Sequence, residues 1–239
     1  MKTLLKKIAK KMGFEVVRTD PSTSHSERMK RLLAHHGIDL VLDVGASAGH
    51  YGKFLRDFGY TGKIISFEPL STAYSELEVV SRNDTLWTVA ARTAIGDVDG
   101  SIEINVSGNS YSSSILDMLD SHLKAAPESA YIGSEVVRIS KLDTIAKGYL
   151  EGGNYSIFLK IDVQGFEAQV LRGASQVLKV IKGVQMELSL IPLYKEQILF
   201  REMLDKMERL GYELHAILPG FTDPETGRLL QMDGIFFKE

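Results

Sequence analysis

Short, continuously apolar runs recur along the chain and alternate with segments of helical periodicity. The runs are Leu40–Val44, Lys63–Phe67, Leu86–Ala90, Ile157–Ile161 and Gly183–Leu188. Runs that are apolar throughout, rather than at every second residue, are typical of strands in a parallel sheet that is buried on both faces. The alternation therefore predicts an open α/β sheet, with helices on both faces and ligands beyond the carboxyl ends of its strands.

Two of the intervening segments carry apolar residues at helical spacing and end at glycine. These residues are Tyr51, Phe54, Leu55 and Phe58 before Gly59, and Leu199, Met203, Met207 and Leu210 before Gly211. Glycine is favoured directly after a helix because it adopts the left-handed backbone conformation without strain. Both segments are predicted to be helices that cover the sheet.

Two regions depart from the parallel pattern. Ser101–Ser107 is apolar at alternate positions, and Glu135–Ile139 offers it an antiparallel partner, which predicts a hairpin inserted between the third and fourth strands. Near the end of the chain, Tyr212–Leu218 and Gly234–Phe237 flank a segment rich in turn-forming residues. These two runs predict a terminal antiparallel pair.

Length and composition set further bounds. The 239 residues suit one domain with added elements, so we expect a helical extension over residues 1–38 and a single domain over residues 39–239. The net charge of −3 provides no basic field for binding nucleic acid. The absence of cysteine excludes disulfides and thiolate metal sites, which suits a cytoplasmic location.

The first residues, Met1–Gly13, are basic and amphipathic. Lysines stand at positions 2, 6, 7, 10 and 11, and apolar residues share one helical face. The apolar stretch is too short for a membrane span and lacks the features of a secretory signal. We expect a short lid or packing helix, the alternative being weak contact with an anionic membrane surface.

A strand, a glycine turn and a helix follow one another in Val41–Gly52. Gly45 and Gly49 let backbone approach a ligand and direct helix N–H groups at it. The glycine spacing is not G-x-G-x-x-G, the pattern of dinucleotide-binding enzymes. A protein that binds another nucleotide-like cofactor is therefore favoured, and a nicotinamide-dependent oxidoreductase is the alternative. Asp43, just before the turn, suits a zwitterionic amino-acid group better than a pyrophosphate, which it would repel.

A second acidic position ends the next strand, in Ile64–Pro69. Glu68 is well placed to accept hydrogen bonds from both ribose hydroxyls of an adenosine, and Pro69 fixes the direction of the chain that follows. The alternative is that Glu68 is an acid favoured at a helix start by the helix dipole. Its combination with the Gly45 turn favours the ribose contact.

Segments spread from Asp39 to the C-terminus resemble one family, the FkbM family of class I methyltransferases. The matching segments are Val41–Gly52, Phe67-Glu68-Pro69, Ala94–Asp97, Ser112–Ser114, Leu159–Glu167, Val170–Ala174, Met186-Glu187 and Met232–Phe237. The family usually carries glutamate where this chain has Gln164, so a role that requires charge at that position does not transfer.

This resemblance implies a Rossmann-like α/β fold with a mostly parallel, seven-stranded sheet and an antiparallel terminal strand. It implies S-adenosylmethionine as cofactor, with the adenine near Ala94. The expected cofactor-binding residues are Asp43, Gly45, Ala46, Gly49, Glu68, Pro69, Ala94 and Asp162. The implied activity is methyl transfer to a hydroxyl oxygen, commonly on a sugar, a glycan or glycolipid, or a polyketide-type small molecule.

Three residues are candidates for catalysis. Asp162, at the expected end of the fourth strand, is the best candidate to orient or deprotonate an acceptor hydroxyl, unless it only caps the next helix. His50 is a possible base that could equally pack or contact the cofactor. Glu187 ends the fifth strand and could face the same cleft. Asp162 and Glu187, even with Asp233, are few ligands for a divalent cation, so we predict no metal.

Two functions of other classes stay open. One is the oxidoreductase, which NAD binding would support. The other is a noncatalytic protein of the same fold that binds the cofactor or a glycan, because a fold does not determine a function. Methyl transfer from labelled cofactor would separate an enzyme from a binding protein.

Overall fold

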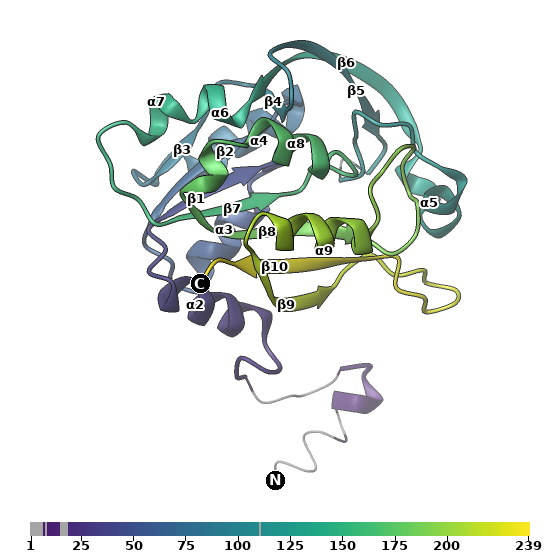
Figure 1. Ribbon diagram of the computed structural model, residues 1–239. Helices are drawn as coiled ribbons and strands as arrows, with labels where there is room; N and C mark the ends of the chain where they lie inside the picture. Colours follow the sequence, from purple (N-terminus) through teal and green to yellow (C-terminus); the bar gives the residue numbers. More distant parts are fainter. Residues whose placement is uncertain (1–6, 8, 15–18, 110) are drawn as a thin grey trace.

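The computed structural model describes residues 7, 9–14, 19–109 and 111–239 (Figure 1). Residues 1–6 and 8 of the amphipathic segment predicted over Met1–Gly13 therefore lie outside the described residues. Within the described part, no helix has both the length and the apolar character that a membrane crossing requires.

A seven-stranded sheet forms the centre of the molecule, in the order β3-β2-β1-β7-β8-β10-β9. The strands are β1 (Leu40–Val44), β2 (Lys63–Phe67), β3 (Trp87–Val89), β7 (Ile157–Ile161), β8 (Ile181–Ser189), β9 (Glu213–Pro219) and β10 (Gln231–Phe237). The first five in the sheet order pair in parallel, whereas β10 is antiparallel to both β8 and β9. The mostly parallel sheet with an antiparallel terminal strand is confirmed.

Helices cover both faces of this sheet (Figure 1). From residue 19 onward, the α-helices of the described chain are α2 (His25–His35), α3 (His50–Asp57), α4 (Ser71–Ser81), α5 (Asp120–Ala125), α6 (Leu142–Ile145), α7 (Lys147–Leu150), α8 (Glu167–Gly173) and α9 (Phe200–Arg209), of which α5 lies apart from the large sheet, beside the smaller inserted one (Figure 1). Leu40, Leu42 and Val44 of β1 belong to one apolar cluster with residues of α8 and α9. Val41 belongs to a second cluster with residues of α2, α3 and α4, because successive strand residues face opposite sides.

A smaller sheet of three strands is inserted between β3 and β7. It contains β4 (Ala94–Gly96), β5 (Gly100–Ser107) and β6 (Tyr131–Lys141), in the order β4-β6-β5. The pair β5 and β6 is the inserted antiparallel hairpin that the sequence predicts. The third strand, β4, pairs in parallel with β6 and was not predicted as a strand. Its three residues are too short a run to stand out from a loop.

The turn-rich segment near the end of the chain connects β9 to β10, which pair as predicted. In the predicted extension, α2 packs against the domain core, because Met29 and Leu33 are fully buried in the cluster that contains Val41. The division at residue 38 stays a prediction.

Candidate active site

The turn after β1 brings two loops into backbone contact. Gly45 has φ +78°, and a Cβ atom built there would come within 1.8 Å of the Asp162 carbonyl oxygen. No other residue fits, so the turn after β1 and the loop after β7 meet at this glycine. Gly49, with φ +84°, is the N-cap of α3. The carboxyl ends of the central strands thus form one compact edge.

Glu68 lies at the end of β2 and is fixed by two backbone groups. Its Oε2 accepts a hydrogen bond from the Ser47 N–H at 2.8 Å, and its Oε1 accepts one from the Leu70 N–H at 2.8 Å. Only 4% of the residue is exposed, and burial raises the pKa of Glu68 to about 7 despite these donors. The carboxylate is therefore oriented but keeps lone pairs for further donors.

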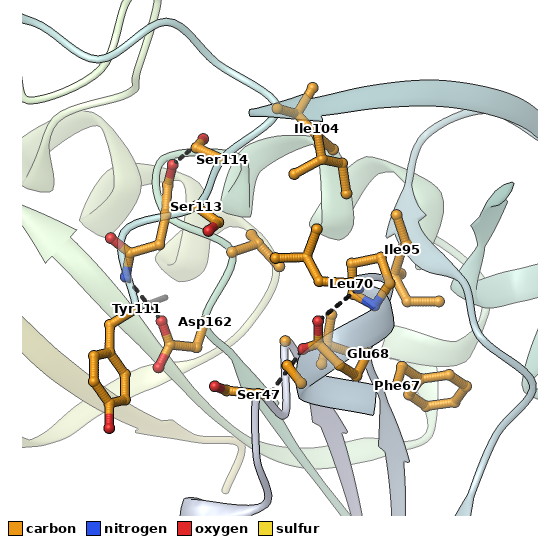
Figure 2. Close-up of a pocket in the computed structure, with 18 of the residues that line it drawn as sticks. Ser47, Phe67, Glu68, Leu70, Ile95, Ile104, Tyr111, Ser113, Ser114 and Asp162 are labelled. Atoms are coloured by element: carbon orange, nitrogen blue, oxygen red, sulfur yellow. Dashed lines mark hydrogen bonds between the residues drawn. The ribbon is translucent and has the colours of Figure 1, made fainter. Parts of the chain in front are cut away.

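A cavity of about 250 Å³ opens at this edge of the sheet. Its lining includes Gly45, Glu68, Pro69, Leu70, Ala94, Ile95, Ile104, Tyr111, Ser113, Ser114, Asp162, Gln164 and Glu187. Figure 2 shows Glu68 and Asp162 on opposite sides of Ser47, with Ile104 of the small sheet above them. One end of the cavity is apolar around Glu68, and the other carries Asp162 and Glu187.

Gln164 connects the two carboxylates at that second end. Its Nε2 donates to Asp162 Oδ1 at 3.1 Å and to Glu187 Oε2 at 2.8 Å. Its Oε1 accepts a hydrogen bond from the Tyr194 hydroxyl at 2.8 Å. An amide satisfies all three contacts because it donates on one side and accepts on the other.

Glu187 and Glu167 are buried acids whose pKa values lie above the usual range. Burial, reinforced by the negative charges of Asp162 and Glu167, raises the pKa of Glu187 well above its usual range. Burial likewise raises the pKa of Glu167 to about 7, although its Oε1 accepts a hydrogen bond from the Gly165 N–H at 3.0 Å. In its ionised form, a carboxylate with a raised pKa is a stronger proton acceptor than an ordinary carboxylate.

Lys160, which the sequence analysis did not single out, is a buried cation beneath the site. Only 5% of it is exposed, and its Nζ donates to Asp162 Oδ2 at 3.1 Å. Its pKa is raised because the nearby carboxylates of Asp162, Asp233 and Glu187 outweigh the effect of its burial. Both oxygens of Asp162 therefore have donors, from Lys160 and from Gln164.

Four buried polar residues form a row across the sheet. Ser66 of β2, Asp43 of β1, Lys160 of β7 and Gln185 of β8 are partners in register on adjacent strands. We call these four residues the polar row. Asp43 and Lys160 are the only polar residues of β1 and β7, and this interruption is the sequence signal that could have identified the row once the register was known.

The predicted site residues divide between the cavity and its surroundings. Gly45, Glu68, Pro69, Ala94, Asp162 and Glu187 line the cavity. Asp43, Ala46 and Gly49 are buried and lie outside the lining. His50 is exposed at the start of α3, with its ring centroid 5.7 Å from that of Tyr111, and it does not line the cavity.

In the described part of the chain, no group of three or more His, Asp or Glu side chains is arranged to hold a metal ion. Lys160 and Gln164 both donate hydrogen bonds to Asp162, and Gln164 also donates to Glu187.

The roof of the cavity comes from the loop after β5. Ser114 donates from its Oγ to the Gln164 carbonyl oxygen at 2.6 Å, which is one of the interactions drawn in Figure 2. Tyr194 contributes from another segment, with its hydroxyl 3.3 Å from the Ser112 carbonyl oxygen. Tyr111, 63% exposed, lies at the open side of the cavity. In the sequence, Ser112–Ser114 is part of the family resemblance, and nothing predicted the attachment of Ser114 to Gln164.

One family model matches most of the chain. The family model described as the methyltransferase FkbM domain matches residues 43–214. No curated protein matches the chain at a significant level.

Solved structures agree on the fold. A Listeria monocytogenes protein assigned as an S-adenosylmethionine dependent methyltransferase superposes with a TM-score of 0.50 at 9% identity, covering 89% of this chain and 96% of that chain. A protein from Thermobifida fusca assigned as a methyltransferase superposes with a TM-score of 0.51 at 11% identity, covering 89% and 78%.

Proposed function

The chain belongs to the FkbM family of S-adenosylmethionine-dependent methyltransferases, and we propose that it transfers the methyl group to a hydroxyl oxygen of an uncharged acceptor. A sugar, a glycan or glycolipid, or a polyketide-type alcohol fits this description. The observation that carries the proposal is the pair of carboxylates, Asp162 and Glu187, held by Gln164 at one end of the cavity.

The residues around Glu68 fit the cofactor. Glu68 is a buried, oriented carboxylate that faces the cavity and can accept ribose hydroxyls, while Ala94 and Ile95 offer apolar contact for an adenine. When bound, S-adenosylmethionine supplies a methyl group activated on a sulfonium. Because displacement at that methyl group is in line, the protein contributes mainly by orienting the acceptor.

The charge of the cavity supports an uncharged acceptor. Its described lining carries three carboxylates, of Glu68, Asp162 and Glu187, and no lysine, arginine or histidine. An acceptor bearing a carboxylate or a phosphate near the reacting hydroxyl would be repelled there. A neutral hydroxyl can donate a hydrogen bond to either carboxylate at the far end.

Asp162 and Glu187 have different roles in this proposal. Both oxygens of Asp162 already accept hydrogen bonds from Lys160 and Gln164, which suits a group that orients the acceptor hydroxyl. Glu187 has the raised pKa, and its Oε2 alone accepts from Gln164 and, at 3.4 Å, from Gln231. We assign proton acceptance to Glu187 as the methyl group is transferred. His50, away from the lining, is the weaker candidate.

The experiment is methyl transfer from isotope-labelled S-adenosylmethionine to matched pairs of acceptors. Each pair consists of a neutral sugar or glycoside and the corresponding uronic acid or sugar phosphate, tested separately. We expect labelled product from neutral members and at least tenfold less from their anionic partners. Equal transfer to both members would contradict the uncharged acceptor, and transfer only to amines would contradict the hydroxyl.

We also propose that the enzyme is cytoplasmic and that the basic segment before α2 makes weak contact with anionic membrane surfaces. Exposed Lys7, Lys10 and Lys11, together with exposed Met12 and Phe14, support that contact. Sedimentation with vesicles containing phosphatidylserine should decrease when the three lysines are changed to glutamine. Equal sedimentation with neutral vesicles would contradict it.

A further inference from the structure

Trp87, the only tryptophan in the chain, lies beneath the turn between β1 and α3. A Cβ atom built on Gly52 would come within 2.1 Å of the indole Cζ2, and one built on Gly49 within 3.2 Å of Cη2. The indole is buried, with 7% of the residue exposed. These two glycines therefore present bare backbone to the ring, and the first turn of α3 rests on it.

The indole also begins a chain of hydrogen bonds that ends at Asp43. Trp87 Nε1 donates to Ser66 Oγ at 3.0 Å, and Ser66 Oγ donates to Asp43 Oδ2 at 3.0 Å. An indole N–H can only donate, so the serine hydroxyl must use its lone pair for Trp87 and its proton for Asp43. The direction of both hydrogen bonds is thereby fixed.

Asp43 needs this support because it is a buried carboxylate. Only 1% of it is exposed, and burial raises its pKa to about 6. The Ser66 hydroxyl and the charge of Lys160, its two neighbours in the polar row, oppose that effect. Asp43 lies two residues before Gly45, so its orientation bears directly on the turn that lines the cavity.

We propose that Trp87 is a positioning residue for S-adenosylmethionine. Its ring supports Gly49 and Gly52, and its N–H acts through Ser66 to hold Asp43 at the start of the cofactor turn. This inference rests on the cofactor that the family match implies and is independent of the acceptor. Failure of the acceptor experiments would leave it standing.

Titration calorimetry with S-adenosylhomocysteine, the demethylated cofactor, tests the proposal. Trp87→Phe keeps an aromatic ring but removes the N–H, and should weaken binding about threefold to tenfold, as loss of one hydrogen bond does. Ser66→Ala should weaken it at least as much. In the Ser66→Ala background, Trp87→Phe should then cost less than it does in the wild type, because the chain of hydrogen bonds is already broken.

Tyr60→Phe is the matched control. Tyr60 is a buried aromatic in the same apolar cluster, and its hydroxyl donates to the Lys63 carbonyl oxygen, away from Asp43. This variant should bind S-adenosylhomocysteine as the wild type does. Unchanged affinity in Trp87→Phe, or losses that simply multiply in the double variant, would overturn the proposal.

Two readouts keep the test decisive if Trp87→Phe folds poorly. Ser66→Ala removes a single oxygen, and its melting temperature shows whether its affinity loss reflects unfolding. Because the chain has one tryptophan, fluorescence excited at wavelengths that tyrosine does not absorb reports on Trp87 alone in the wild type. Its emission should change along the same curve as calorimetric binding. Unchanged emission at saturation, or full affinity in folded Ser66→Ala, would contradict the role of Trp87.

Discussion

The two ends of the cavity are built in different ways. At the Glu68 end, backbone N–H groups of Ser47 and Leu70 hold one carboxylate, and all three residues lie close together in sequence or at adjacent strand ends. At the other end, side chains of Gln164 and Lys160 hold Asp162, and Gln164 also holds Glu187. Backbone groups thus fix the end that we propose for the cofactor, whereas side chains build the end that we propose for the acceptor.

This difference predicts which substitutions affect cofactor binding and which affect catalysis. A change at the Glu68 end should act on cofactor affinity, and a change at the Glu187 end should act on turnover. Lys160 of the polar row lies between the two ends in the sheet, because it donates to Asp162 and is paired in register with Asp43.

The largest effect is expected from Glu187→Gln, which keeps the shape of the side chain but cannot accept the proton. Loss of a general base should lower kcat by about 10²–10⁴-fold. Asp162→Asn should lower it less, by about tenfold, if Asp162 only orients the hydroxyl. Steady-state kinetics measure both, with exposed Glu213→Gln as control. A larger loss in Asp162→Asn than in Glu187→Gln would make Asp162 the base.

The next effect concerns Glu68→Ala, which removes charge-assisted contacts to the ribose hydroxyls. The loss should be about 1.5–3 kcal/mol, or about 10- to 150-fold in the dissociation constant of S-adenosylhomocysteine. Calorimetry measures it, and the thermal unfolding curve checks that the variant is folded. An unchanged dissociation constant in the folded variant rules out the ribose contact, and with it the contrast between the two ends.

A smaller effect follows from pH. Burial raises the pKa of Glu68 to about 7, and ribose hydroxyls donate to its ionised form, so binding favours loss of the proton. Cofactor affinity should therefore increase as pH rises through 7, by at most about tenfold per pH unit, with protons released on binding. Calorimetry in buffers of different ionisation enthalpy measures that release. Proton uptake, or the same pH dependence in Glu68→Ala, would be incompatible with this assignment.

The smallest effect is expected at the roof. Ser114→Ala removes the hydrogen bond to the Gln164 carbonyl oxygen at 2.6 Å and should weaken S-adenosylhomocysteine binding about twofold to fivefold. Ser75→Ala on the exposed side of α4 is the matched control. Affinities that agree within error for the two variants would mean that the roof does not support the cofactor.

A further test concerns metal. Lys160 and Gln164 already donate to the carboxylates, so activity should persist in EDTA and should not increase on addition of Mg²⁺. The labelled-methyl assay measures this. Activity abolished by EDTA and restored by Mg²⁺ would instead make Asp162 and Glu187 ligands.

Much of the fold could be predicted from the sequence because its signals are local. The runs Leu40–Val44, Lys63–Phe67 and Ile157–Ile161 match their strands residue for residue. A strand that is buried on both faces is apolar along almost its whole length, so the run itself marks the strand. The short β4 could not be predicted in this way. It is a strand because β6, far along the chain, pairs with it.

The site was predictable to the same extent and for the same reason. Glu68 and Asp162 directly follow β2 and β7, and Glu187 lies near the end of β8; parallel strands bring such positions to one edge of a sheet. Lys160 and Trp87 could not be recognised from their own segments. Their roles depend on the register of neighbouring strands and on which side chain lies beneath Gly52.

The most direct test of the account is the chemical identity of the methylated product. S-adenosylmethionine with a ¹³C-labelled methyl group is incubated with the enzyme and the panel of neutral and anionic acceptors, and the products are examined by NMR. The account predicts a labelled methyl group on an oxygen of a neutral acceptor, and no such product from Glu187→Gln. A label on nitrogen or carbon, or preferred transfer to an anionic acceptor, would contradict it.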